Sequence, residues 1–180
     1  MKYWLDTEFI ERGREHSIDL ISIALVAEDG REFYAENLEV DLSKANDWVK
    51  VNVIPHLWSK QKDKSKFNLW SRDGGVGGLL PRRDIASEIH RFCHPNTYGT
   101  PEFWADYGSY HWVIFSQLFG LMVDLPEGFP MYCNDIQQLE RSLREEAGEL
   151  INKMPTQLQG LHHALEDARQ CKKKWEFITQ

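Results

Sequence analysis

An Asp-Gly pair at positions 29 and 30 narrows the choice of folds more than any other part of this chain. It lies between residues 18–27, dense in isoleucine, leucine and valine, and residues 31–35, which include two aromatic side chains. Asp-Gly between apolar runs is a strong signal for a tight β-hairpin, because glycine adopts the positive φ of the turn. Residues 2–8 alternate loosely and are rich in aromatics, which adds a strand. We therefore expect three opening strands, at least two of them antiparallel.

Helical and strand patterns alternate after these strands. Ser43 is a good N-cap for a helix over residues 44–54, which Pro55 ends, and the polar, Gly-rich residues 59–82 indicate a loop. Further helices are expected at 83–93, 109–119, 135–149 and 161–177, and further strands at 101–107 and 131–133. This order predicts an α/β architecture in a single domain over residues 1–180.

The composition is that of an ordinary globular chain: 42% of its 180 residues are hydrophobic and 27% are charged, which excludes a disordered class. No apolar run approaches the ~20 residues that span a bilayer, and the N-terminus reaches charge too early for a signal peptide. We expect a cytoplasmic protein with no membrane partner. Cys93, Cys133 and Cys171 are odd in number and far apart, which favours reduced thiols over disulfides or structural zinc.

A formal net charge of −7 by itself argues against a nucleic-acid partner, because phosphate contacts use lysine and arginine. The objection weakens where a carboxylate cluster binds divalent cations, since the ions supply local positive charge. Basic stretches at residues 60–66 and 172–174 are candidate phosphate contacts, although such runs are more often solvated surface.

Asp6-Thr7-Glu8 is the first candidate for chemistry. On a strand, Asp6 and Glu8 point to the same face about 7 Å apart. Like charges held this close repel unless a cation lies between them, and oxygen ligands suit Mg²⁺ or Mn²⁺. The plainer interpretation is a solvent-facing strand edge with two acids.

The second candidate is the C-terminal segment that contains His162, His163 and Asp167. Helical periodicity of ~100° per residue places His163 and Asp167 on one face. His162 can reach the same site only from a loop before the helix, which Gly160 permits. Two ordinary surface histidines at a helix start are the alternative. A third segment, residues 74–78, is Gly-rich but lacks a Lys-Ser/Thr ending, so a flexible loop is favoured over a phosphate-binding loop.

Taken together, the D-x-E pair on the first strand, the hairpin and the H-x-x-x-x-D pattern from His162 to Asp167 resemble the DEDDh exonucleases of the RNase H-like fold. Leu-Ile-Ser-Ile at 20–23, residues 26–32 and Gln-Leu-Phe-Gly at 117–120 are similar to the small bacterial and phage exoribonucleases of the Rv-type subgroup, relatives of RNase T and oligoribonuclease. The resemblance covers nearly the whole chain, and its blocks fall in the same order on the same elements.

This resemblance implies a mixed sheet, with three antiparallel N-terminal strands plus two parallel strands, flanked by helices. It implies hydrolysis of RNA from the 3′ end, releasing nucleoside 5′-monophosphates with two Mg²⁺ or Mn²⁺ ions. Asp6 would bridge the ions, Glu8 and Asp167 would complete one of them, and His162 would take the proton of the attacking water. An imidazole suits that role because its ordinary pKa of ~6.5 lies near neutral pH.

The residues next to the acidic pair are the expected substrate contacts. By resemblance, Thr7, Phe9 and Ile10 would touch the terminal nucleotides, because aromatic stacking on a base is tolerant of sequence. A core position for Phe9 is the equally weighted alternative.

One position departs from the resemblance. The family carries a further Asp after the fourth strand, and His111 stands at that position here. Three interpretations remain open: His111 binds or orients the second metal, Asp106 substitutes for the missing acid, or the second-metal site is impaired. A slow or inactive RNA 3′-end-binding protein is therefore an alternative function.

Single-stranded RNA or an RNA 3′ overhang is the expected partner, on resemblance alone. Nothing in the residues separates RNA from DNA, because reading the 2′-OH is a matter of pocket geometry. A 3′–5′ DNA exonuclease is thus the other alternative, and a homodimer is an expected assembly.

Overall fold

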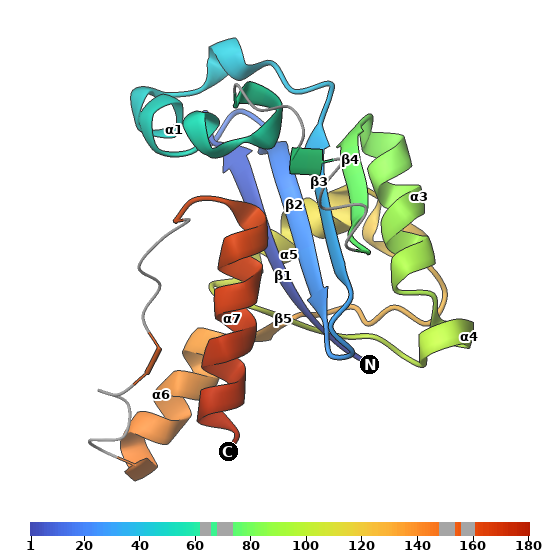
Figure 1. The fold of residues 1–180 in the computed structure, drawn as a ribbon, viewed down its shortest axis with the longest axis vertical. Helices are drawn as coiled ribbons and strands as arrows, with labels where there is room; N and C mark the ends of the chain where they lie inside the picture. The colour runs from blue at the N-terminus through green and yellow to red at the C-terminus, as the bar shows by residue number, and fades with distance from the viewer. Residues whose placement is uncertain (62–65, 68–73, 148–153, 156–160) are drawn as a thin grey trace.

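The computed structural model describes residues 1–61, 66–67, 74–147, 154–155 and 161–180. Its strands form a six-stranded sheet in the order β4-β3-β2-β1-β5-β6 (Figure 1). They are β1 (Lys2–Ile10), β2 (Asp19–Ala27), β3 (Glu32–Asn37), β4 (Val76–Leu80), β5 (Glu102–Ala105) and β6 (Asn134–Asp135). The pairings β1–β2 and β2–β3 are antiparallel, whereas β3–β4, β1–β5 and β5–β6 are parallel. The predicted mixed α/β sheet, compatible with an RNase H-like fold, is confirmed.

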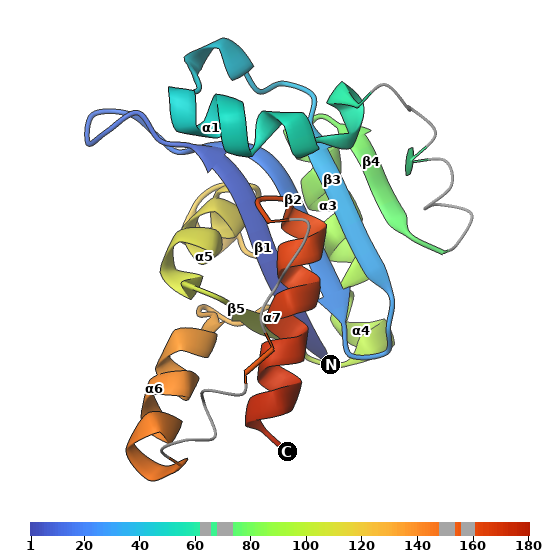
Figure 2. The ribbon, with the colours of Figure 1, turned by 60° about the vertical axis from the view of Figure 1, so that its left-hand side comes forward.

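The predicted hairpin lies between β2 and β3. Gly30 has a φ of 90°, and the Ala27 N–H donates to the carbonyl of Arg31 at 2.8 Å across the turn. In Figure 2 the other hairpin loop, which joins β1 to β2, projects beyond the sheet beside α1.

Helices flank the sheet on both faces. They are α1 (Asp47–Asn52), α3 (Arg82–Phe92), α4 (Pro95–Tyr98), α5 (Gly108–Gln117), α6 (Ile136–Ala147) and α7 (Ala164–Ile178). Short 3-10 turns lie at Leu42–Lys44, Ile54–His56, Trp58–Lys60 and Met122–Asp124. Figures 1 and 2 show α7 lying along β1 and β2 on one face, with α3 and α5 on the other. None of the helices within the described ranges is long and apolar enough to cross a membrane.

Strand β1 contributes side chains to both layers, because successive residues of a strand point to opposite faces. Tyr3 is fully buried in a cluster with Ile85 of α3 and Phe115 of α5. Trp4 is buried with Cys171 of α7 in a separate cluster. The same alternation directs the even positions, including 6 and 8, toward α7 and the odd positions, including 7 and 9, toward α5.

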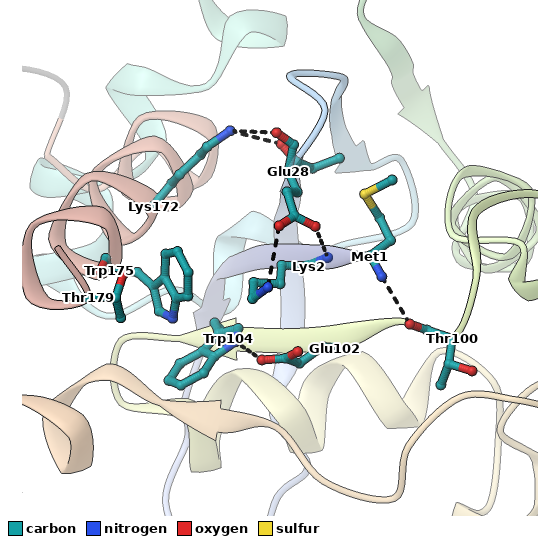
Figure 3. Close-up of polar contacts among 10 residues, drawn as sticks. Met1, Lys2, Glu28, Thr100, Glu102, Trp104, Lys172, Trp175 and Thr179 are labelled. Carbon is teal, nitrogen blue, oxygen red and sulfur yellow. Dashed lines mark hydrogen bonds and ion pairs between the residues drawn. The ribbon is translucent and has the colours of Figure 1, made fainter.

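Lysine side chains fasten α7 to the rest of the molecule. Lys172 Nζ donates to the carbonyl oxygens of Ala27 at 3.0 Å and Glu28 at 3.4 Å, as Figure 3 shows. Lys174 pairs with the Asp106 carboxylate. Within the predicted basic stretch at 172–174, Lys173 is exposed, whereas Lys172 and Lys174 are partly buried and bind the protein itself.

The prediction of a continuous loop over residues 59–82 is wrong, because Val76–Leu80 form β4 at the edge of the sheet. The glycines hide the strand pattern, and Gly77 is required by the packing: a Cβ there would lie 2.0 Å from the carbonyl oxygen of Tyr34. Only glycine fits this close approach of two backbones, and glycine is depleted in ordinary strands. Residues 62–65 and 68–73 of this segment, with Lys62 and Lys64, lie outside the described residues.

Ser43 is not the N-cap of α1. Its hydroxyl donates to Asp41 at 2.6 Å within a 3-10 turn, and Asn46 caps α1 by accepting from the Val49 N–H at 2.9 Å.

The last predicted strand shifts from 131–133 to Asn134–Asp135, because pairing with β5 begins only at Asn134. Residues 148–149 of the helix predicted at 135–149, and Gly160, lie outside the described residues. Cys93, Cys133 and Cys171 are free thiols, as predicted.

Candidate metal centre and active-site cavity

Three carboxylates meet where β1 passes under the start of α7. Asp6 and Glu8 project from the α7 face of β1, and Asp167 comes from the first turns of α7. Each offers a carboxylate oxygen, and these oxygens all lie within 4.8 Å of one another. Asp6 and Glu8 are each only 9% exposed, so the cluster is mostly removed from bulk water.

The start of α7 holds Asp167 in position. His163 is the N-cap of this helix, and its main-chain N–H donates to Asp167 Oδ2 at 3.1 Å. An acid near a helix N-terminus is also favoured by the helix dipole. One carboxylate oxygen of Asp167 is therefore committed to the helix start, and the group remains oriented toward β1.

Mutual repulsion and burial act strongly on this cluster. Burial, followed by the charge of Asp167, raises the pKa of Glu8 to about 8. Burial, followed by the charges of Glu8 and Asp167, raises the pKa of Asp6 well above its ordinary value. Neither Asp6 nor Glu8 pairs with a lysine or arginine in the part of the chain that the structure describes.

These carboxylates fit a divalent cation. Buried like charges cost free energy unless a cation lies among them, and three oxygen donors suit the hard ions Mg²⁺ and Mn²⁺. Without a cation, burial and repulsion favour protonation of these acids. A bound ion would neutralise the carboxylates instead.

The two adjacent histidines have different surroundings. Helix α7 begins at Ala164, so His162 precedes it, with a left-handed φ of 61°. His162 lines the same cavity as Asp6, Glu8 and Asp167, and its ring meets the indole of Trp48 edge-on at 4.7 Å between centroids.

His163 is buried away from that cavity. Its ring stacks on Tyr34 at 4.7 Å and lies 5.2 Å from Trp58. Burial lowers the pKa of His163 to about 4, with the charges of nearby basic groups acting in the same direction. His163 does contact Asp167, as helical periodicity predicts, but it does so through its main-chain N–H and not through its imidazole.

The other two candidate ligands, His111 and Asp106, are not part of the carboxylate cluster, although His111 adjoins Asp6. His111 Nδ1 accepts from the Thr7 N–H at 3.1 Å and lies 2.9 Å from the Thr7 hydroxyl, while Nε2 lies 3.4 Å from Asp6 Oδ1. Asp106 pairs with Lys174 and accepts from Gln137 Nε2 at 2.7 Å. Burial lowers the pKa of His111 to about 4, against the opposing effects of Asp106 and Asp135.

The cavity beside the cluster has a volume of about 340 Å³. Thr7 and Phe9, both predicted substrate contacts, line it. The remaining lining residues are Asp6, Glu8, Glu11, Asn46, Trp48, Val49, His111, His162 and Asp167. Phe9 is half-buried and lies parallel to Tyr110, 6.2 Å away between centroids, so it belongs to both the core edge and the cavity wall.

Ile10 is not among the residues that line the cavity, so the geometry gives no support to its predicted contact with a base. It is fully buried beside Ile21 and Val49, because the strand alternation turns it under α1. The sequence did not single out Trp48, which is 53% exposed and faces His162. Nothing in the sequence around Trp48 indicates a role at the site, because its contact with His162 depends on how α1 packs over β1.

Comparisons with known proteins agree along the whole chain. Residues 1–179 match the family described as the 3′–5′ exoribonuclease Rv2179c-like domain. Two relatives in Mycobacterium tuberculosis, the 3′–5′ exoribonuclease MT2234.1 of strain CDC 1551 / Oshkosh and the 3′–5′ exoribonuclease Rv2179c of strain H37Rv, are each 36% identical over 179 residues. Each alignment covers 99% of this chain and 94% of the relative. This chain therefore belongs to the family of Rv2179c-like 3′–5′ exoribonuclease domains.

Proposed function

We propose that the protein is a metal-dependent 3′–5′ exoribonuclease of the DEDDh type, acting as one domain over residues 1–180 and releasing nucleoside 5′-monophosphates. The observation that carries the proposal is the gathering of Asp6, Glu8 and Asp167 within 4.8 Å beside a cavity that His162 also lines. Family membership supports the direction of cleavage and the RNA substrate.

Asp6, Glu8 and Asp167 would hold the cation that the cluster fits. Two Mg²⁺ or Mn²⁺ ions, when bound, supply a Lewis acid for the phosphoryl oxygens and lower the pKa of a bound water. The three carboxylates account for the protein ligands of one ion. A second would share Asp6 and have few other protein ligands, since Asp106 is committed to Lys174.

His162 would accept the proton of the attacking water. It lies in a turn before α7, and an imidazole that abstracts a proton must reach the water in the cavity. Attack of the water oxygen on phosphorus breaks the bond to the 3′ oxygen of the preceding nucleotide, which leaves with a proton. Phe9 and Trp48, which both line the cavity, would pack against the terminal nucleotide and hold it over the carboxylates.

End-labelled RNA and DNA oligomers, each incubated with Mg²⁺, Mn²⁺ or EDTA, test this proposal. We expect stepwise shortening of RNA from the 3′ end, nucleoside 5′-monophosphate as product, and no cleavage in EDTA. A circular RNA should remain intact, since it has no 3′ end. Full activity in EDTA, or fragments from the circle, would refute the proposal, and faster shortening of DNA would move the substrate to DNA.

The position of His111 favours a second candidate, an RNA 3′-end-binding protein with impaired turnover. A neutral imidazole next to Asp6 brings no negative charge to a second cation. In that case the protein would bind single-stranded RNA through its 3′ end and shorten it very slowly in Mg²⁺. The dimer and the cytoplasmic location stay predictions.

A further inference from the structure

His111 stands where the parallel pairing of β1 stops. Strand β5 pairs with β1 only as far as Ala105 beside Leu5. The chain then turns at Tyr107, which has a left-handed φ of 60°, and enters α5. Beyond that point the β1 main chain needs a hydrogen-bond partner other than β5.

The His111 ring supplies that partner. The Thr7 main-chain N–H donates to His111 Nδ1 at 3.1 Å. An amide N–H can only donate, so Nδ1 must be the ring nitrogen that carries a lone pair. In a neutral imidazole the proton then resides on Nε2. The hydrogen bond therefore fixes the tautomer.

The protonated nitrogen faces the carboxylate cluster. His111 Nε2 lies 3.4 Å from Asp6 Oδ1, and both side chains are mostly buried, at 12% and 13% exposed. A main-chain interaction with Asp106 acts to raise the pKa of His111, against the larger effect of burial. With one lone pair used by Thr7 and the other nitrogen protonated, this ring has no electron pair to give to a cation.

We propose that His111 is a positioning residue and not a cation ligand. Its Nδ1 is anchored to the edge of β1 through Thr7, and its Nε2 lies against Asp6 from the α5 side, 3.4 Å from Oδ1. A carboxylate has about four lone-pair sites, so the remaining sites of Asp6 stay directed toward Glu8 and Asp167. This inference rests on the proposed metal dependence, and its first test needs no metal.

The first experiment is nitrogen NMR of the isotope-labelled, metal-free protein, with the His111 signals assigned by their loss in His111→Asn. We expect a neutral ring with the proton on Nε2 at neutral pH. A ring protonated on Nδ1, or on both nitrogens, would overturn the proposal, because such a ring cannot accept from Thr7.

The second experiment asks whether nitrogen binds the metal. Electron paramagnetic resonance of the Mn²⁺-loaded protein reveals a directly bound imidazole through its nitrogen hyperfine signal. We expect no such signal in the wild type. A signal that is present in the wild type and lost in His111→Asn would identify His111 as a ligand and refute the proposal.

Two matched variants separate the two contacts of the ring. His111→Gln keeps an amide N–H near the position of Nε2, whereas His111→Asn keeps a polar group only near Nδ1. Removing an outer-shell partner of a metal ligand typically lowers metal affinity about 10- to 100-fold. We expect that loss of Mn²⁺ affinity in His111→Asn and a clearly smaller loss in His111→Gln, measured by calorimetry. Equal losses would contradict a role through Asp6.

These readouts keep the inference distinct from the proposed function. If Mn²⁺ binds as expected and RNA is not shortened, the catalytic proposal fails while the positioning role stands. If the wild type binds no Mn²⁺ at all, both fail.

Discussion

The two faces of β1 stabilise buried polar groups in different ways. On the α7 face, Asp6 and Glu8 meet Asp167, and burial, followed by the charge of Asp167, raises the pKa of Glu8 to about 8. On the α5 face, Thr7 contacts the neutral imidazole of His111, and the polar groups of the two residues form hydrogen bonds with each other. Only the α7 face is left with an electrostatic cost that a cation would remove.

A third acid shows that charge alone does not make a metal ligand. Asp106 interacts electrostatically with Asp6, yet its carboxylate pairs with Lys174 and accepts from Gln137. Its negative charge is compensated by the protein. Asp106 therefore differs from the three clustered acids because a lysine neutralises its charge. The predictions below test this contrast and the contrast between the two faces of β1.

The largest effect is expected from neutralising the cluster. Asp6→Asn or Asp167→Asn should lower RNA hydrolysis by about 10³-fold or more, because a metal centre contributes several kcal/mol to the transition state. Rates on end-labelled RNA measure this, and circular dichroism checks folding. The matched control is Asp106→Asn, which should cost less than about tenfold. Abolished turnover in a folded Asp106→Asn protein would make Asp106 a ligand and remove the contrast between the acids.

The adjacent histidines give the next effect. His162→Ala should lower turnover by about 10²–10⁴-fold, the usual contribution of a general base. His163→Phe keeps an aromatic ring between Tyr34 and Trp58 and should leave turnover nearly unchanged. Single-turnover rates decide between them, and the opposite result would transfer the role of base to His163.

A smaller effect is expected from giving the α5 face a negative charge. His111→Asp should lower the Mg²⁺ concentration for half-maximal activity about tenfold, because a carboxylate adds a ligand for a hard cation. In EDTA the same variant should melt at a lower temperature than the wild type, since the new acid adjoins Asp6. Unchanged metal dependence would mean that position 111 has no influence on the second cation.

The smallest effect concerns stability against pH. The folded pKa of Glu8 is about 8, against an ordinary value of 4.5, so the folded state binds more protons than the unfolded state between these values. Stability of the metal-free protein should therefore fall as pH rises through this window. His111 and His163, with pKa values lowered to about 4 from 6.5, act in the opposite direction below about pH 6.5.

The clean measurement is consequently the melting temperature in EDTA between about pH 6.5 and pH 8, where only the acids contribute. Glu8→Gln should flatten the decline, and Mn²⁺ should raise the melting temperature most at the upper end, because a ligand that binds only the folded state stabilises it. A melting temperature that rises with pH in this window would contradict the raised pKa of Glu8.

Much of this architecture could be predicted from local patterns. The Asp-Gly turn needs only two residues to specify a hairpin, and the alternation of β1 alone places Asp6 and Glu8 on one face. The edge strand β4 could not be predicted in this way, because Gly77 is required by the backbone of Tyr34 and has no signal of its own. Ser43 has the side chain of a typical N-cap, but its hydroxyl donates to Asp41, and Asn46 caps α1 instead.

The sequence by itself determined the opening hairpin, most of the helices that follow it, and the placement of Asp6 and Glu8 on one face of their strand. These follow from the periodicities of strands and helices, which are properties of neighbouring residues. The tertiary structure decided that Asp167 approaches β1, that Lys174 compensates Asp106 and that Thr7 engages the His111 ring. Each of those contacts joins segments 68 to 161 residues apart in the chain, and the partner of a buried polar group at such a separation depends on how the layers pack.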